Sequence, residues 1–193
     1  MFKEQIMKTR YLAFFAALGT VLAATNVYAD EDSMRRVTVL DVPSPSVEQV
    51  DEALFPTDIS KLKVECAQME KAGLRCQSSV PKSSMDTVQV TFAKSSVELS
   101  ADAKVFLKSV GESLKKHSNE MKSLTIEGYA DASGAETFNK TLSKQRAESV
   151  KKFLATNYHV TNIETVGMGS EHLRDPANPG AEVNRRIEFV PNW

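Results

Sequence analysis

The stretch IEGYADASGAETFNKTLSKQRAESVKKFL, residues 126–154, joins two kinds of hydrophobic pattern. The apolar run Leu124 to Tyr129 predicts a strand, and helical spacing returns from Leu142 to Leu154. A strand followed by a helix that packs back across the sheet is a basic unit of layered α/β and α+β folds. The stretch therefore predicts a sheet covered by helices.

The flanking sequence repeats this alternation. Val88 to Phe92 alternates apolar and polar residues as a strand does, and Ser100 can cap a helix that runs to His117. Ile163 to Val166 and Arg185 to Phe189 predict two further strands. We therefore expect residues 85–193 to form an α+β domain. It should be a two-layer sandwich with a mixed βαβαββ sheet and helices on one face.

Residues 30–84 have a different character, and we expect them to form a small helical segment in front of the domain. Three prolines interrupt residues 30–56, which predicts an extended arm with one short helix from Val47 to Leu54. A second helix is predicted to begin at Thr57 and to stop at Gly73.

Cys66 and Cys76 are the only cysteines of the chain. Two thiols ten positions apart in an oxidising compartment predict a local disulfide that clips the second helix. A redox-active pair is the alternative, although such pairs usually have two residues between the cysteines.

Residues 1–29 resemble a secretory signal peptide. Lys3, Lys8 and Arg10 precede an uncharged run from Tyr11 to Ala24, and small residues up to Ala29 suit cleavage there. An uncleaved anchor is the alternative, but the run has 14 residues where a membrane span needs about 20. We expect export and cleavage, without a lipid anchor, because no cysteine is near the cleavage site.

Composition and motifs exclude several kinds of function. With 24 basic and 25 acidic residues, the chain has no basic excess for nucleic acid. The histidines form no recognisable motif with a serine or cysteine nucleophile. Glu171, His172 and Asp175 share one loop, a set more typical of solvated surface than of a metal site. Gly167 and Gly169 are half of a dinucleotide fingerprint. We expect no catalytic centre, metal or cofactor.

Asp131 and Arg146 are the strongest candidates for a binding site. Asp131 follows the strand that ends at Tyr129, and Arg146 lies early in the returning helix, so the two can face one pocket. A turn aspartate and a solvated helix arginine would give the same sequence. Spacing alone leaves both readings open.

Residues 85–193 resemble the OmpA-like peptidoglycan-binding domain found in OmpA, in Pal lipoproteins and in flagellar stator subunits. The resemblance rests on several sequence blocks in the family's order and spacing. They are VTFAKSSVELS (90–100), IEGYADASGAETFN (126–139), LSKQRAESVKKFL (142–154), VGMGS (166–170) and NRRIEF (184–189).

The resemblance implies that Asp131 and Arg146 bind meso-diaminopimelate of the peptidoglycan stem peptide. An aspartate can accept hydrogen bonds from its ammonium group, and a planar guanidinium can hold its carboxylate with two. Asn139 matches a family asparagine that can hydrogen-bond the ligand, and Arg185 is expected to reach the pocket. The chain departs from the family at Ala130, where threonine is common.

These features together predict a non-catalytic protein that binds the cell wall without covalent attachment. We expect it in the periplasm of a Gram-negative bacterium, with peptidoglycan as its partner. The alternative is an envelope adaptor in which residues 30–80 dock a protein complex and the wall domain is only a tether.

Overall fold

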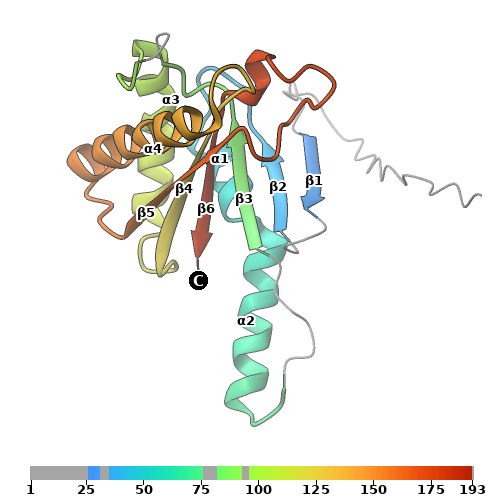
Figure 1. Cartoon of the computed structure of the whole chain (residues 1–193). Coiled ribbons are helices and arrows are strands. Elements are labelled where there is room, and N and C mark those ends of the chain that lie inside the picture. Colours follow the sequence, from blue (N-terminus) through green and yellow to red (C-terminus); the bar gives the residue numbers. More distant parts are fainter. Residues whose placement is uncertain (1–25, 31–34, 76–81, 93–95, 193) are drawn as a thin grey trace, which may run out of the picture.

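The computed structural model of the chain describes residues 26–30, 35–75, 82–92 and 96–192 (Figure 1). Within these residues, six strands form one mixed sheet in the order β1-β2-β3-β6-β4-β5. The β2–β3 and β4–β5 pairs are parallel and the other pairs are antiparallel. The strands are β1 (Asn26–Asp30), β2 (Arg35–Val39), β3 (Lys82–Thr87), β4 (Ser123–Tyr129), β5 (Ile163–Gly169) and β6 (Ile187–Asn192).

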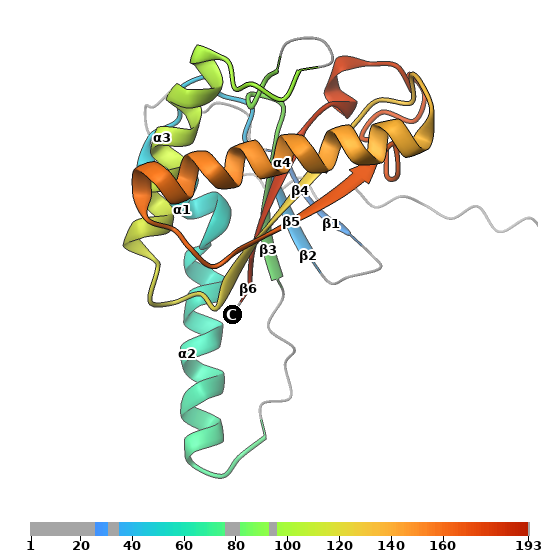
Figure 2. The same cartoon turned by 60° about the vertical axis from the view of Figure 1, so that its left-hand side comes forward.

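The helices of the described residues comprise four α-helices and one short 3₁₀ helix. They are α1 (Val47–Leu54), α2 (Thr57–Lys71), α3 (Ala101–Lys116), α4 (Glu136–Tyr158) and η1 (Glu182–Asn184). None of these helices is long and apolar enough to cross a membrane. Figures 1 and 2 show α4 lying across β4 and β5, while α2 extends away from the rest of the protein.

One hydrophobic core lies between the sheet and α1, α3 and α4. Ile126 of β4 and Phe189 of β6 are paired across the sheet and both are fully buried in this core. Phe106 of α3 and Val150 of α4 cover them from the helical layer and are equally buried. The predicted α+β sandwich, with a mixed sheet and helices on one face, is therefore confirmed.

Two glycines bring α4 unusually close to the sheet. A Cβ atom at Gly128 of β4 would lie 2.2 Å from the carbonyl oxygen of Ser143, and one at Gly167 of β5 would lie 2.3 Å from that of Lys140. Any larger residue would push the helix away, because backbone atoms cannot yield as a flexible side chain can. The glycines therefore set the distance between α4 and the sheet, and so they also set the position of Arg146.

The first strand of the domain differs from its prediction. It lies at Lys82–Thr87 and not at Val88–Phe92, which forms a loop with one bridge between Phe92 and Leu99. The sequence KSSMDT hides this strand because its buried side chains are mostly polar and find partners within the fold. Ser83, for example, donates to the carbonyl oxygen of Leu54.

The expected arm is part of the fold. β2 pairs in parallel with β3, so the N-terminal segment widens the sheet from four strands to six. The helix α1 has the predicted bounds, and its Val50 and Leu54 are fully buried in the common core. The physical reason is the apolar face of α1, which is stabilised by burial against α3 and the sheet.

Two of the N-terminal predictions fall wholly or partly outside the described residues. Residues 1–25 of the expected signal peptide are not described, and residues 26–29 belong to β1. Cys66 is buried on α2, whereas Cys76 is not among the described residues. Cleavage after Ala29 and the Cys66–Cys76 disulfide both stay predictions.

Candidate ligand-binding pocket

A pocket of about 390 Å³ opens where β4 ends and where β6 begins. Its walls come from the loop after β3, from the end of β4, from one face of α4 and from the η1 turn. All four predicted binding residues line it: Asp131, Asn139, Arg146 and Arg185. The pocket therefore brings together residues that lie far apart in the sequence.

Asp131 lies two residues beyond β4, and only 8% of it is exposed. Its Oδ1 accepts hydrogen bonds from the backbone N–H of Ser133, at 2.8 Å, and from the Ser133 hydroxyl. Its Oδ2 accepts one from Nη1 of Arg185, also at 2.8 Å. Burial raises the pKa of Asp131, but the hydrogen bonds from Ser133 and Arg185 outweigh burial and hold the pKa below its ordinary value. Asp131 is therefore a stable anion.

Arg146 projects into the pocket from the interior of α4, which begins at Glu136 and not at Leu142, where the helical spacing was predicted to start. Its Nε donates to the carbonyl oxygen of Ser96 at 3.1 Å, and its guanidinium lies 5.1 Å from the centre of the Phe92 ring. Within the described part of the chain, neither Nη1 nor Nη2 of Arg146 has a hydrogen-bond partner.

Electrostatics make Arg146 receptive to an anion. Burial lowers its pKa, and the positive charge of Arg185 lowers it further, while Asp131 acts in the opposite direction. The structure describes both Asp131 and Arg146, and these two residues do not form an ion pair with each other. Arg146 is thus a nearly buried cation, 8% exposed, that still has hydrogen-bond donors to give.

Asn139 lies one turn into α4 and is 4% exposed. Its Nδ2 donates to the carbonyl oxygens of Asp131 and Ser133, at 3.1 and 3.0 Å. Both amide hydrogens are thus used to hold the loop that carries Asp131. The amide oxygen of Asn139 is the part of the side chain that is left for a ligand.

Arg185 lines the pocket, but it does not lie in the strand predicted for residues 185–189. It lies just before β6, at the end of η1, and not within a strand. Besides its bond to Asp131, it has Nη2 3.4 Å from Oε1 of Glu182. The neighbouring Arg186, which was not among the predicted binding residues, also lines the pocket.

Arg186 is held by protein groups on several sides. Its Nε lies 3.2 Å from Oδ2 of Asp86, and its Nη2 donates to the carbonyl oxygen of His172 at 3.0 Å. Its guanidinium stacks 3.7 Å from the ring centre of Tyr129. With 6% exposure it forms part of the pocket floor.

Sequence reasoning missed Phe92 and Glu182 as pocket residues. Phe92 lies in the loop that was predicted as a strand, and no local pattern reveals that it stacks on Arg146. Glu182 precedes Arg185 by three positions, a spacing that brings two side chains together in a helical turn. This spacing is the one sequence signal for their pairing.

A second group of charged and polar residues lies on the face of the sheet opposite the core, and we call it the closed cluster. It comprises Arg35, Ser84, Glu127, Tyr129 and Glu188, of which Tyr129 also lines the pocket. Glu188 accepts from the Ser84 hydroxyl at 2.6 Å and lies 3.4 Å from Arg35 and from the Tyr129 hydroxyl. Glu127 accepts from Arg35 at 3.2 Å and from Tyr129 at 2.8 Å. The carboxylates and hydroxyls of this cluster are therefore paired within it, and of the atoms of Arg35 the buried Nε has no hydrogen-bond partner among the described residues.

The pocket can therefore bind a small ligand that carries an anion and a cation on neighbouring atoms. Arg146 offers paired donors to a carboxylate, and Asp131 offers a carboxylate to an ammonium group. Phe92 and Phe138 add apolar walls. Among the described residues, no group of three or more histidine, cysteine, aspartate or glutamate side chains is arranged to hold a metal ion.

Comparison with known proteins gives this pocket a family context. Residues 91–186 match the sequence model of the OmpA family. Outer membrane porin F of Pseudomonas aeruginosa is 32% identical over 105 residues, which are 52% of this chain and 29% of the porin. The peptidoglycan-binding protein ArfA of Mycobacterium tuberculosis is 43% identical over 72 residues, 36% of this chain and 22% of ArfA.

The chain spans less than half the length of these curated relatives. Among solved structures, the periplasmic domain of Helicobacter pylori MotB superposes with a TM-score of 0.50 and 19% sequence identity, covering 57% of this chain and 76% of that one. This likeness concerns the fold. The chain therefore carries an OmpA family domain, and the matched residues include Asp131, Arg146 and most of the pocket lining.

Proposed function

We propose that this pocket binds peptidoglycan through the zwitterionic end of meso-diaminopimelate, without catalysis and without covalent attachment. The observation that carries the proposal is that Arg146 is a nearly buried cation that lines the pocket. Its Nη1 and Nη2 donate no hydrogen bond to any described residue. A buried charge is costly unless it is paired, so a ligand carboxylate at this position gains a strong partner.

Asp131 gives the proposal its second half. It faces the same pocket as Arg146 and remains ionised, so it can accept hydrogen bonds from an ammonium group on the same ligand carbon. A stem peptide with lysine at this position has the ammonium group but no carboxylate. Such a ligand would leave Arg146 unpaired, so we expect the pocket to discriminate against it.

The names of relatives support the same direction. ArfA is described as a peptidoglycan-binding protein. The region of this chain that matches the OmpA family model includes Asp131 and Arg146. Porin F is an outer-membrane protein, and the probable lipoprotein YiaD of Escherichia coli is 34% identical over 110 residues. With the signal-like residues 1–29, these relatives support export to the periplasm and association with the cell wall.

Co-sedimentation with purified sacculi tests the proposal. The wild-type protein should sediment with diaminopimelate-containing sacculi, and free meso-diaminopimelate should release it. Arg146→Met should strongly reduce sedimentation and Asp131→Asn should weaken it, while sacculi with lysine at the stem position should bind weakly at best. Normal retention of an Asp131→Asn/Arg146→Met double variant would overturn the proposal.

A second candidate function is that of an adaptor, and α2 favours it. This helix extends away from the rest of the protein and exposes Val64 (57%), with Leu74 (59%) just beyond its end. Deleting residues 30–80 would not test this role cleanly, because β2 and α1 belong to the sheet and the core. A photo-crosslinking residue at Val64 should instead capture an envelope protein, whereas one at Lys152 on α4 should not. Identical products from both positions would argue against docking through α2.

A further inference from the structure

Arg185 already occupies the acidic side of the pocket. Its Nη1 donates to Oδ2 of Asp131 at 2.8 Å, while Ser133 supplies two donors to Oδ1. A carboxylate has about four lone-pair positions, so most of the accepting capacity of Asp131 is in use. The chain itself neutralises the aspartate, whereas Arg146 still has terminal nitrogens that bond to no described residue.

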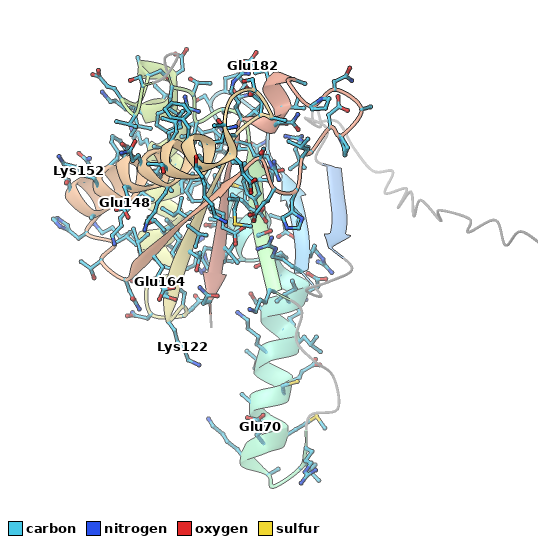
Figure 3. The ribbon with its side chains drawn as sticks, in the orientation of Figure 1. Glu70, Lys122, Glu148, Lys152, Glu164 and Glu182 are labelled. Atoms are coloured by element: carbon cyan, nitrogen blue, oxygen red, sulfur yellow. The ribbon has the colours of Figure 1, made fainter. Side chains whose placement is uncertain are left out.

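A second carboxylate lies beside Arg185. Nη2 of this arginine is 3.4 Å from Oε1 of Glu182, whose side chain is 78% exposed. The Arg185 side chain is itself 39% exposed, so it can rotate in solvent on the fast timescale of surface side chains. Arg185 can therefore leave Asp131 by rotation and still keep an acidic partner. Figure 3 shows Glu182 at the end of the molecule that carries η1.

We propose that Arg185 replaces the ligand's ammonium group whenever that group is absent, so that the pocket accepts its ligand with the amine either free or acylated. This role rests on the proposed function, because it needs a ligand carboxylate at Arg146. A ligand with a free ammonium group displaces Arg185 toward Glu182 and takes its place on Asp131. A ligand with an acylated amine carries no positive charge there, and Arg185 stays.

The physical reason is the cost of leaving Asp131 unpaired. Suppose that the ligand supplied the only positive charge near Asp131. Every ligand without that charge would then leave the buried carboxylate unpaired and would bind much more weakly. Arg185 removes that penalty. The ligand carboxylate, held by Arg146, then decides binding, and the amine can be joined to a second peptide without loss of recognition.

Two probes test this role on the full-length protein. One is free meso-diaminopimelate, and the other is its N,N′-diacetyl derivative, in which both amines are acylated. Isothermal titration should give affinities within about tenfold of each other for the wild-type protein. In Arg185→Gln the affinity for the diacetyl probe should fall by about tenfold or more. The free amino acid should bind at least as tightly as before, because it no longer has to displace an arginine from Asp131.

Two further variants sharpen the test. Glu182→Gln should lower the affinity for the free amino acid by a few-fold and leave the affinity for the diacetyl probe unchanged, because only the free ammonium group requires Arg185 to move. Arg36→Gln is the matched control: Arg36 is 36% exposed and lies 2.8 Å from Asp58, outside the pocket. It should change neither affinity, and a similar change of the ratio in Arg36→Gln would overturn the proposal.

The outcomes separate this role from the proposed function. A wild-type protein that binds the free amino acid but rejects the diacetyl probe more than about 100-fold overturns the role of Arg185 alone. If Arg185→Gln lowers the affinity for both probes equally, the role of Arg185 is also overturned, because Arg185 would then simply contact the ligand in both cases. A wild-type protein that binds neither probe nor sacculi overturns both proposals.

Discussion

The pocket and the closed cluster are built from the same kinds of residue, yet they differ in one respect. In the closed cluster, Ser84 and Arg35 face one oxygen of Glu188 and Tyr129 faces the other. In the pocket, Arg146 donates one hydrogen bond to a described residue and points its remaining donors into a cavity. Asp131 and Arg146 are each 8% exposed, so they are buried to a degree similar to that of the charged groups in the closed cluster.

The comparison shows that buried charge alone does not identify a binding site. Groups that satisfy one another stabilise a fold, whereas a buried cation that lacks an acceptor beside a cavity has capacity left for a ligand. The two regions should therefore respond in opposite ways to the loss of one charge. In the closed cluster the loss affects folding, and in the pocket it affects binding.

The largest effect is expected from Glu188→Ala. It leaves Arg35 and Ser84 without their shared acceptor in a site that is 3% exposed, so we expect the free energy of unfolding to fall by about 3 kcal/mol. Urea denaturation measures this change. Glu188→Gln, which keeps an acceptor oxygen, should cost less. Loss of sacculus binding at unchanged stability would make the closed cluster part of the binding site and would erase the comparison.

Arg146→Met should show the reverse pattern. Methionine keeps the contact with Phe92 but removes the donors, which are worth up to about 3 kcal/mol with a charged partner, so sacculus affinity should drop on the order of 100-fold. The free energy of unfolding should change by less than about 1 kcal/mol, because one hydrogen bond and an unpaired charge are lost together. Arg146→Lys, which keeps the charge without the planar fork, should be intermediate. A destabilisation as large as that of Glu188→Ala would contradict the distinction.

Acid should distinguish the two regions through their carboxylates. The pKa of Asp131 lies below its ordinary value of 3.8, so its stabilisation is present above that pH and is lost as the pH falls through the folded pKa. Burial raises the pKa of Glu188 above 4.5, so its contribution is full below 4.5 and is lost as the pH rises through the folded pKa.

Urea denaturation between about pH 7 and about pH 3 measures this difference. On acidification, the stability advantage of the wild type over Asp131→Asn should shrink. The stability of the wild type relative to Glu188→Gln should rise over the same range. Parallel changes in the two comparisons would mean that the carboxylates do not differ as described.

The smallest effect is expected from Ala130→Thr. Ala130 lines the pocket beside Asp131 and is 5% exposed. A threonine hydroxyl can add one hydrogen bond to the ligand, so affinity for meso-diaminopimelate should rise by a few-fold, from about 0.5–1 kcal/mol. Ala130→Val adds similar bulk without the hydroxyl and serves as the control. An equal gain in both variants would assign the effect to packing.

Much of the fold could be predicted from the sequence because apolar residues recur at helix or strand spacing in most of its helices and strands. Helix α1 has its predicted bounds, and the strand at residues 124–129 differs from β4 by one residue. Strand β3 could not be found in this way, since KSSMDT buries polar side chains whose partners are distant in sequence. The pairing of β2 with β3 depends on the same long-range contacts.

The site could be predicted in part. The sequence pointed to Asp131, Asn139, Arg146 and Arg185, and all four line one pocket. Their individual contacts could not be predicted, because they depend on side-chain geometry. The bond between Asp131 and Arg185 joins residues 54 positions apart, and both amide hydrogens of Asn139 are used within the protein.

The position of α2 has a mechanical consequence. Figure 3 shows Glu182, beside the pocket, and Glu70, on α2, at opposite ends of the molecule, with the strands running between these ends in Figure 1. If the wall holds one end and a partner holds the other, the pulling force acts along the strands. Hydrogen bonds between strands lie across that direction, so they are loaded in shear and must yield together. A hairpin that is pulled open from its end breaks one bond at a time, so this sheet is oriented to resist tension.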